Sequence, residues 1–418
     1  MNFYDIVKII FISSQIILFL FLIYHGTISA FGFLPVKRPS KLWEPKKRFA
    51  LVVAAHNEEV VISAVIDSLK KLNYPRELYD IMIIADNCTD NTAQIARKMG
   101  AQVFERFNGI ERGKGFALKW MFKRIYKMNR HDAIVVFDAD NLVDQDYLMY
   151  MNNELIQGHK IIQGYLDTKN PDDTWVTKSY AISYWYMARI WQVARQKLQL
   201  PGALGGTGMC FEINTLKKLG WDATSLTEDL EFTMKAILRG IKPRWCHHAK
   251  IYDEKPLTFV ASWDQRLRWM QGHWDVAFMY CGKLFRKFFK EGDFAALDGA
   301  FYLLQPGRIL LAYFALFVNI FLWISPNINV EQWLNFGNQW PFHIWLTILI
   351  VQWLFPPIIA IIVLFETKKI KHLSGLLYYN IFGITWLPLT IIALFTKNNR
   401  IWKHTKHTRK ISIEELSA

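Results

Sequence analysis

The feature that most constrains this chain is the placement of four long apolar runs at its two ends. Residues 8–24 contain one lysine and no acid, and residues 309–324, 344–365 and 376–395 contain no charged residue at all. A helix that crosses the hydrocarbon core of a membrane needs about 20 mostly apolar residues. Buried core helices are the alternative, but four such runs clustered at the ends favour membrane helices.

The chain therefore divides into a membrane–soluble–membrane plan. We expect an N-terminal membrane anchor at 1–36, a central α/β domain at 37–275, interfacial amphipathic helices at 276–300, transmembrane helices at 301–396 and a basic tail at 397–418. We expect the first run to be retained, because it is long and lacks a clear small-residue cleavage site.

The net charge of +14 is concentrated beside the apolar runs, as in KRPSKLWEPKKR at 37–48 and KLFRKFFK at 283–290. Basic flanks mark the cytoplasmic side and attract anionic lipid, so the charge indicates a bilayer partner and no nucleic acid. We expect a multi-pass protein of the cell membrane with a cytoplasmic central domain. Four full spans would place the basic tail outside. We expect a cytoplasmic tail, so the number of spans stays open.

The first half of the central domain alternates β-rich and amphipathic segments. The expected strands occupy 48–55, 79–85, 101–106 and 132–138, and the expected helices occupy 58–72, 91–100 and 113–128. This alternation predicts a mostly parallel sheet flanked by helices. Ligands in such sheets bind beyond the carboxyl ends of the strands.

Carboxylates follow three of these strands, in HNEE at 56–59, DNCTDNT at 86–92 and DADN at 138–141. Asp138 and Asp140, at i and i+2 in an extended segment, point the same way and repel unless a cation holds them. Mn²⁺ or Mg²⁺, completed by a diphosphate, is the natural partner. Neither GxGxxG after the first strand nor a P-loop occurs, so a common dinucleotide fold is excluded.

Three later segments complete the set of motifs. The glycine-rich segment GGTGMCF at 205–211 lets the backbone come close to another group. The segment TEDLEF at 227–232 begins an amphipathic helix, with Thr227 as its expected cap. In QRLRWMQGHW at 265–274, Gln265, Arg268 and Trp269 have helical spacing, which places residues at i and i+3 on one face. A membrane-surface helix is the alternative for this last segment.

Taken in order, AHNEE, ADNCTDNT, GKGFAL, FDADN, TED and QRLRW resemble the processive family-two glycosyltransferases, such as cellulose, hyaluronan and poly-N-acetylglucosamine synthases. The resemblance covers about residues 48–275. It implies a GT-A catalytic domain, a UDP-sugar donor, a divalent metal and a growing polysaccharide that leaves through a channel of membrane helices. The motif DNCTDNT departs from the pattern of many relatives, which have two adjacent aspartates or a serine at this place. Accessory export or regulatory subunits are possible partners, but the sequence does not reveal them.

The resemblance also implies the role of each residue. Asp138 and Asp140 would hold the metal. The nucleotide sugar would contact Glu58, Asp86, Lys114, Asp138 and Arg268. Asp229 would be the general base, with Glu228 and Thr227 in the same catalytic motif. The acceptor would contact Gln265, Trp269 and Gly206.

The expected function is processive, inverting polymerisation of UDP-glucose to a cellulose-like or mixed-linkage β-glucan, with translocation of the polymer. A poly-N-acetylglucosamine or hyaluronan-type synthase is one alternative, and a non-processive enzyme acting on a lipid acceptor is another. An inactive scaffold is disfavoured by the complete set of three aspartates. The motif IWKHTKH at 401–407 either gates the site or lies on lipid headgroups.

Overall fold

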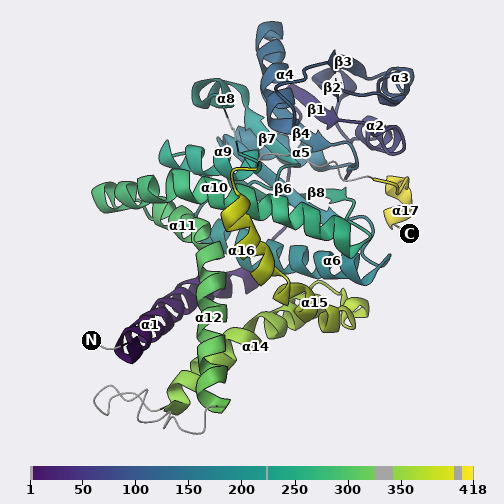
Figure 1. Cartoon of the computed structure of the whole chain (residues 1–418). Coiled ribbons are helices and arrows are strands. Elements are labelled where there is room, and N and C mark those ends of the chain that lie inside the picture. Colours follow the sequence, from purple (N-terminus) through teal and green to yellow (C-terminus); the bar gives the residue numbers. More distant parts are fainter. Residues whose placement is uncertain (1–2, 223–224, 325–341, 400–406, 418) are drawn as a thin grey trace.

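The computed structural model describes residues 3–222, 225–324, 342–399 and 407–417 (Figure 1). Its centre is a sheet with the strand order β3-β2-β1-β4-β7-β6-β8-β5. The strands are β1 (Phe49–Ala55), β2 (Tyr79–Asp86), β3 (Gln102–Arg106), β4 (Ala133–Asp138), β5 (Leu142–Val143), β6 (Ile161–Thr168), β7 (Met209–Glu212) and β8 (Arg244–Asp253).

The first four strands pair in parallel, and the rest of the sheet is mixed. β1 lies between β2 and β4 in parallel register, and β3 pairs in parallel with β2, which confirms the predicted strand–helix alternation. β7 is antiparallel to both β4 and β6, whereas β6 and β8 are parallel. The second half of the sheet therefore departs from the plain parallel pattern that the alternation predicts.

Helices cover both faces of the sheet, which explains why β1 is buried on both sides. On one face, Leu51 and Val53 pack against α2 (Ile62–Lys70), α3 (Thr92–Lys98) and α5 (Tyr147–Ile156). On the other face, Ala50 and Val52 lie in a core built with α4 (Lys114–Met128), α8 (Ile213–Leu219) and α9 (Glu228–Leu238). A short 3₁₀ helix, η2 (Arg76–Leu78), precedes β2.

The remaining helices form the lower part of the molecule in Figure 1, except for the short C-terminal helix, which lies beside the sheet domain, where Glu414 pairs with Lys71 at 2.7 Å. They are α1 (Phe3–Ala30), η1 (Phe31–Phe33), α6 (Trp175–Met187), the π-helix η3 (Ala188–Val193), α7 (Ala194–Lys197), α10 (Phe259–Glu291), α11 (Phe294–Leu303), α12 (Gln305–Ile324), α14 (Phe342–Glu366), η4 (Ile370–His372), α15 (Gly375–Ile384), α16 (Trp386–Thr396) and α17 (Ile413–Ser417).

The long helix α10 joins the two parts. The Thr258 hydroxyl caps its start by accepting the N–H of Ala261, and Gly292 ends it in a left-handed conformation. One side of α10 packs against α9 and α11. From the other side, Gln271 donates to the Thr396 hydroxyl at 2.9 Å and Trp274 to the Thr390 carbonyl at 3.1 Å. The helix is continuous through residue 275, and Phe278 and Phe289 in its second half are exposed.

Within the described ranges, two helical segments have the length and composition to cross a membrane. They are Ile9–Phe33 and Gly375–Thr396, and a third span exists if Phe294–Leu303 and Gln305–Val318, bent by 54°, count as one. The predicted run at 344–365 forms α14, in which Pro356–Glu366 is a shorter apolar stretch. Residues 325–341 lie outside the described residues, so the number of spans remains a prediction.

Candidate active site

The carboxyl ends of β1, β2 and β4 bring their following residues to one edge of the sheet. Ala55 is level with Ala85, and Ala54 is level with Asp138, so Glu58, Asp86 and Asp138 leave the sheet on the same side. This edge is where an α/β sheet binds its ligands. The structure therefore gathers the acidic strand ends that the sequence singles out.

Asp86 is held by an arginine that the sequence analysis missed. Nη1 of Arg106 donates to Oδ1 of Asp86 at 2.6 Å, and Nη2 donates to the Glu111 carbonyl at 2.6 Å. Both side chains are buried. Arg106 ends β3, next to β2 in the sheet, so its parallel pairing was the signal that could have found it.

Glu58 is buried and contacts His407, the last residue of the predicted gate. Nδ1 of His407 lies 2.9 and 3.1 Å from the two carboxylate oxygens of Glu58. Burial lowers the pKa of His407, but Asp140 and Glu58 outweigh this effect and raise it to about 9. The imidazole is therefore protonated at neutral pH and donates to Glu58. Residues 401–406 of the gate lie outside the described residues.

The residues after His407 are anchored at the same edge. Backbone N–H groups of Thr408 and Arg409 donate to the Glu254 carboxylate at 2.9 and 3.2 Å. Lys169 pairs with Glu254 at 3.0 Å and donates to the Arg409 carbonyl at 3.0 Å. The start of the described tail thus lies against the site, and Glu254 and Lys169 are site residues that the sequence analysis did not identify.

Asp138 and Asp140 lie where β4 ends. The N–H of Asp138 donates to Asn141 Oδ1 and to the Thr207 hydroxyl, both at 3.1 Å, which fixes the turn. Asp140 is buried and accepts the N–H of Glu254 at 2.7 Å. Burial raises the pKa of Asp140, but His407 and Lys169 outweigh it, so the pKa is below its usual value.

Lys114, in the first turn of α4, connects the two halves of the site. Its ammonium group donates to Asp138 and to the Gly206 carbonyl, the latter at 2.8 Å. Burial lowers the pKa of Lys114, but Asp138 and Glu228 together raise it above its usual value. Lys114 is thus a fixed cation among carboxylates, and its role in binding the nucleotide sugar stays a prediction.

Asp229 lies in the first turn of α9, beside the glycine-rich segment. A Cβ on Gly206, whose φ is +81°, would lie 3.5 Å from Oδ2 of Asp229. Burial and the neighbouring Glu228 raise the pKa of Asp229 to about 7. A carboxyl group with this pKa accepts a proton far more readily than an ordinary aspartate.

The predicted capping role of Thr227 is wrong. Thr227 is the N-cap residue of α9, but its side chain makes no capping hydrogen bond, and its buried hydroxyl has no partner among the described residues. The reason is the close approach of α10. A Cβ at Gly272 would lie 2.5 Å from the Thr227 hydroxyl and 2.8 Å from its backbone nitrogen. Packing against α10 therefore determines the position of Thr227.

The residues of QRLRW point in two directions. Gln265 accepts a hydrogen bond from the Tyr180 hydroxyl at 2.9 Å, and Trp269 packs edge-on against Tyr180. Arg268 is half-buried and makes no hydrogen bond or ion pair with any residue that the structure describes. Arg266 points toward α15 and α16, where it donates to the Thr385 hydroxyl at 2.7 Å. Arg268 is thus free to meet a ligand, whereas Arg266 joins the helices.

The sequence analysis also missed Asp253, because this residue reaches the site at the end of β8. Asp253 ends β8, and Lys255 pairs with it at 2.6 Å. Burial raises the pKa of Asp253 to about 6, since Asp140 and Asp138 add to the effect and Lys255 offsets it only in part. Lys255 also lies 3.2 Å from the ring centroid of Tyr184.

This crowding fits a divalent cation at Asp138 and Asp140. Both offer hard carboxylate oxygens where β4 ends, and Asp253 lies close enough to interact electrostatically with them. Within the described part of the chain, three or more His, Cys, Asp or Glu side chains do not converge in metal-binding geometry. Asp138 and Asp140 would supply carboxylate ligands, and a diphosphate and water would supply others.

The sheet, the aspartate pair after β4 and the acidic start of α9 define a GT-A glycosyltransferase. Residues 45–272 match the family described as "Glycosyltransferase like family 2", which is more than half of the chain. The chain belongs to this family. It is a glycosyltransferase, and the match covers all but the two ends of the expected central domain at 37–275.

Curated relatives are similar over part of their length. The chain is 26% identical over 293 residues to the probable glycosyltransferase YdaM of Bacillus subtilis (strain 168), covering 66% of this chain and 69% of that protein. It is 28% identical over 247 residues to the beta-monoglucosyldiacylglycerol synthase of Nostoc sp. (54% and 50% covered). It is 28% identical over 235 residues to the poly-beta-1,6-N-acetyl-D-glucosamine synthase of Staphylococcus epidermidis (54% and 55% covered). The chain thus spans about half the length of the latter two.

Among solved structures, the mannosyltransferase PcManGT from Pyrobaculum calidifontis, in complex with GDP-Man and Mn²⁺, has a similar fold. The TM-score is 0.59 with 16% sequence identity, and the match covers 94% of this chain and 99% of that one. At this identity the similarity supports the fold alone.

Proposed function

We propose that the chain transfers a sugar from a UDP-sugar donor to an acceptor hydroxyl at the membrane face, with inversion at the anomeric carbon. The observation that carries this proposal is the position of Asp229. It lies beside Gly206, whose carbonyl accepts from Lys114, and Lys114 also contacts Asp138. Asp229, the proposed proton acceptor, and Lys114, the cation on the donor side, thus both lie next to Gly206.

The donor would lie along the carboxyl edge of β1, β2 and β4. Glu58 and Asp86 would hold the nucleoside, and Asp138 and Asp140 would hold Mn²⁺ or Mg²⁺. When bound, the metal supplies charge stabilisation to the leaving diphosphate. Lys114 and Arg268 would stabilise the same charge from the protein side. His407 would have to leave Glu58, or share it, when the donor binds.

The acceptor would approach from the side of α10. Gln265 and Trp269 would orient its sugar ring, and Gly206 would let it come close to the backbone. Asp229 takes the hydroxyl proton while the oxygen bonds to the anomeric carbon and the bond from that carbon to the phosphate oxygen breaks. UDP leaves with the bonding electrons, and an α-linked donor gives a β-linked product. A positioned base contributes typically about 10²–10⁴-fold to such a step.

For the product, we propose a β-glucan made processively from UDP-glucose and passed through the membrane helices to the outside, with the catalytic domain in the cytoplasm. The contacts of α10 with α15 and α16 favour a polymer, because the helix that carries Gln265 and Trp269 also borders the membrane part. A lipid acceptor is a second candidate, favoured by the similarity to beta-monoglucosyldiacylglycerol synthases. Poly-N-acetylglucosamine is a third, favoured by the similarity to its synthases.

The test is a UDP-release assay on the detergent-purified full chain with Mn²⁺ or Mg²⁺. UDP-glucose, UDP-N-acetylglucosamine and UDP-glucuronate are offered separately and together, with and without diacylglycerol, and the product is sized and digested. Long polymer from UDP-glucose alone supports the first proposal, and single addition to lipid supports the second. Asp229→Asn should abolish UDP release, whereas Asp222→Asn, at an exposed aspartate, should not. Full activity of Asp229→Asn would overturn the assignment of the base.

A further inference from the structure

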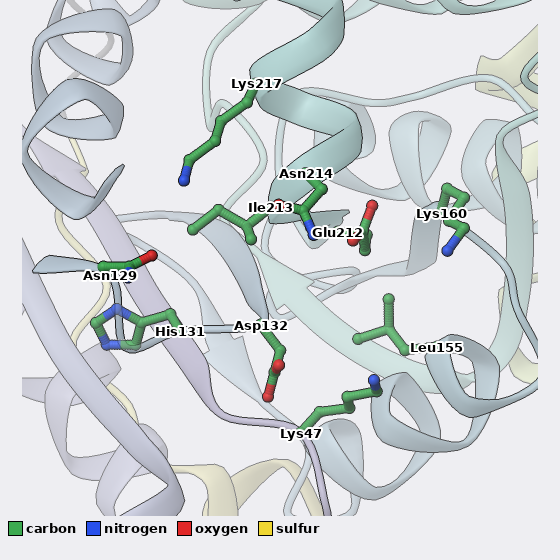
Figure 2. Close-up of a pocket in the computed structure, with 10 residues that line it drawn as sticks. All are labelled: Lys47, Asn129, His131, Asp132, Leu155, Lys160, Glu212, Ile213, Asn214 and Lys217. Carbon is green, nitrogen blue, oxygen red and sulfur yellow. The ribbon is translucent and has the colours of Figure 1, made fainter. Parts of the chain in front are cut away.

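A second polar cavity lies at the opposite edge of the sheet from the active site. It has a volume of about 220 Å³ and is lined by Lys47, Asn129, His131, Asp132, Leu155, Lys160, Glu212, Ile213, Asn214 and Lys217 (Figure 2). Lys47 precedes β1, Asp132 precedes β4 and Lys160 precedes β6, so the amino ends of these strands frame it. No role proposed above uses this edge.

Three lysines enter the cavity from different sides, as Figure 2 shows for Lys47, Lys160 and Lys217. In the described part of the chain, no carboxylate lies within ion-pair distance of any of these three ammonium groups. Like charges placed around one space repel each other, and an anion in that space removes the repulsion. The cavity therefore suits an anionic group.

The two acids in the lining are already engaged with the backbone. Oδ2 of Asp132 accepts the N–H of Arg48 at 2.7 Å. Oε2 of Glu212 caps α8 by accepting the N–H of Thr215 at 2.8 Å. These hydrogen bonds fix the two carboxylates in place, and Lys160 interacts electrostatically with Glu212. The three lysines still outnumber the two acids in the lining, so a net positive charge faces the cavity.

His131 adds a buried polar atom that lacks a partner. Its Nε2 lies 2.7 Å from Oδ2 of Asp80, while Nδ1 is buried and makes no hydrogen bond with the described residues. Burial lowers the pKa of His131 despite Asp80, so the ring is neutral, with its proton on Nε2. The ring thus closes one side of the cavity, while the amides of Asn129 and Asn214 in the lining offer polar groups to a ligand.

We propose that this cavity binds a small phosphate ester that also carries hydroxyl groups, the chemistry of a sugar phosphate. The lysines would receive the phosphate, and the asparagines would receive the hydroxyls. The volume is below the range of about 300–1,000 Å³ that is usual for drug-sized ligands, so a single phosphorylated ring is the appropriate size. This site is independent of the proposed glycosyl transfer.

The test is isothermal titration calorimetry on the detergent-purified full chain. Glucose 6-phosphate and inorganic phosphate are the probes, and glucose is the uncharged comparison. UDP and Mn²⁺ are kept at saturation to occupy the active site. We expect glucose 6-phosphate to bind at one site per chain, more tightly than phosphate and far more tightly than glucose. Absence of binding with UDP and Mn²⁺ at saturation would overturn the proposal, because binding seen only without UDP would belong to the active site.

The matched variants remove equal charge from exposed lysines. Lys160→Ala with Lys217→Ala should weaken glucose 6-phosphate binding at least tenfold. Lys98→Ala with Lys218→Ala removes two lysines that do not line the cavity, one of them next to Lys217 on α8, and should change binding less than twofold. Equal weakening by both pairs would mean non-specific attraction and would also overturn the proposal.

Discussion

Arg195 of α7 and Asp298 of α11 form a two-pronged ion pair. Nε of Arg195 donates to Oδ2 and Nη2 to Oδ1, both at 2.8 Å, and both side chains are buried. The Tyr24 hydroxyl donates to the same Oδ1 at 2.8 Å. One carboxylate thus ties α1, α7 and α11 together, although the three segments are far apart in sequence.

Asp298→Asn should destabilise the protein strongly, because it leaves the Arg195 cation buried without a counter-charge. Breaking a buried pair costs about 3–5 kcal/mol. Thermal unfolding in detergent measures the loss. Glu291→Gln, which breaks an exposed pair with Lys287, should cost less than about 1 kcal/mol and serves as the control. Replacing both partners, as Arg195→Met with Asp298→Leu, should recover much of the loss. If the double variant regains no stability, the loss in Asp298→Asn is not mainly due to the unpaired charge of Arg195.

The pH–rate profile should fall on its acidic side as Asp229 becomes protonated. Its pKa of about 7 means that the base is half protonated near neutral pH and mostly protonated below it, so initial rates should fall as the pH drops below about 7. Glu228→Gln removes the like charge that helps to raise this pKa, so its limb should move to lower pH. Initial rates from pH 5.5 to 8.5 measure both effects. An unmoved limb in Glu228→Gln would exclude Asp229 as the titrating group.

The sequence predicted the first half of the catalytic domain well, because local signals determine it. The strands at 48–55 and 132–138 appear within one residue of their predicted bounds, since unbroken runs of buried β-formers leave little choice. The predicted helix at 58–72 begins only at Ile62, because the residues after Glu58 form a turn.

The missed residues depend on distant pairing. Asp253 and Glu254 reach the site through the pairing of β8 with β6, which shifts register at Gly164/Tyr165. His407 meets Glu58 across 349 residues of sequence. In the sequence Thr227 resembles an ordinary helix cap, but in the structure the close approach of α10 determines the position of its side chain. Periodicity and propensity do not encode such contacts.

Gly272→Ala should impair catalysis through geometry. The added Cβ would lie 2.8 Å from the backbone nitrogen of Thr227, so α10 must move away from the start of α9 and from Asp229. A misplacement of about 1 Å at a reacting group can cost about 10²-fold in rate. Gly282→Ala lies on the same helix, with nothing within 4 Å of the added atom. It should keep full activity and gain up to about 1 kcal/mol of stability. Steady-state rates and thermal unfolding of the two variants separate these effects, and equal activity would contradict the predicted contact.

Chelation should remove activity without unfolding the catalytic domain. The carboxylates that would hold the metal have partners within the chain, because Lys114 pairs with Asp138 and the N–H of Glu254 donates to Asp140. EDTA should therefore abolish UDP release while the melting temperature changes by less than about 2 °C, and Mn²⁺ or Mg²⁺ should restore activity. Asp140→Asn should weaken this rescue and raise the Mn²⁺ concentration needed for half-maximal rate, whereas the exposed Asp222→Asn should not. Undiminished transfer in EDTA would show that the aspartate pair acts without a metal, with Lys114 as the charge that faces the diphosphate.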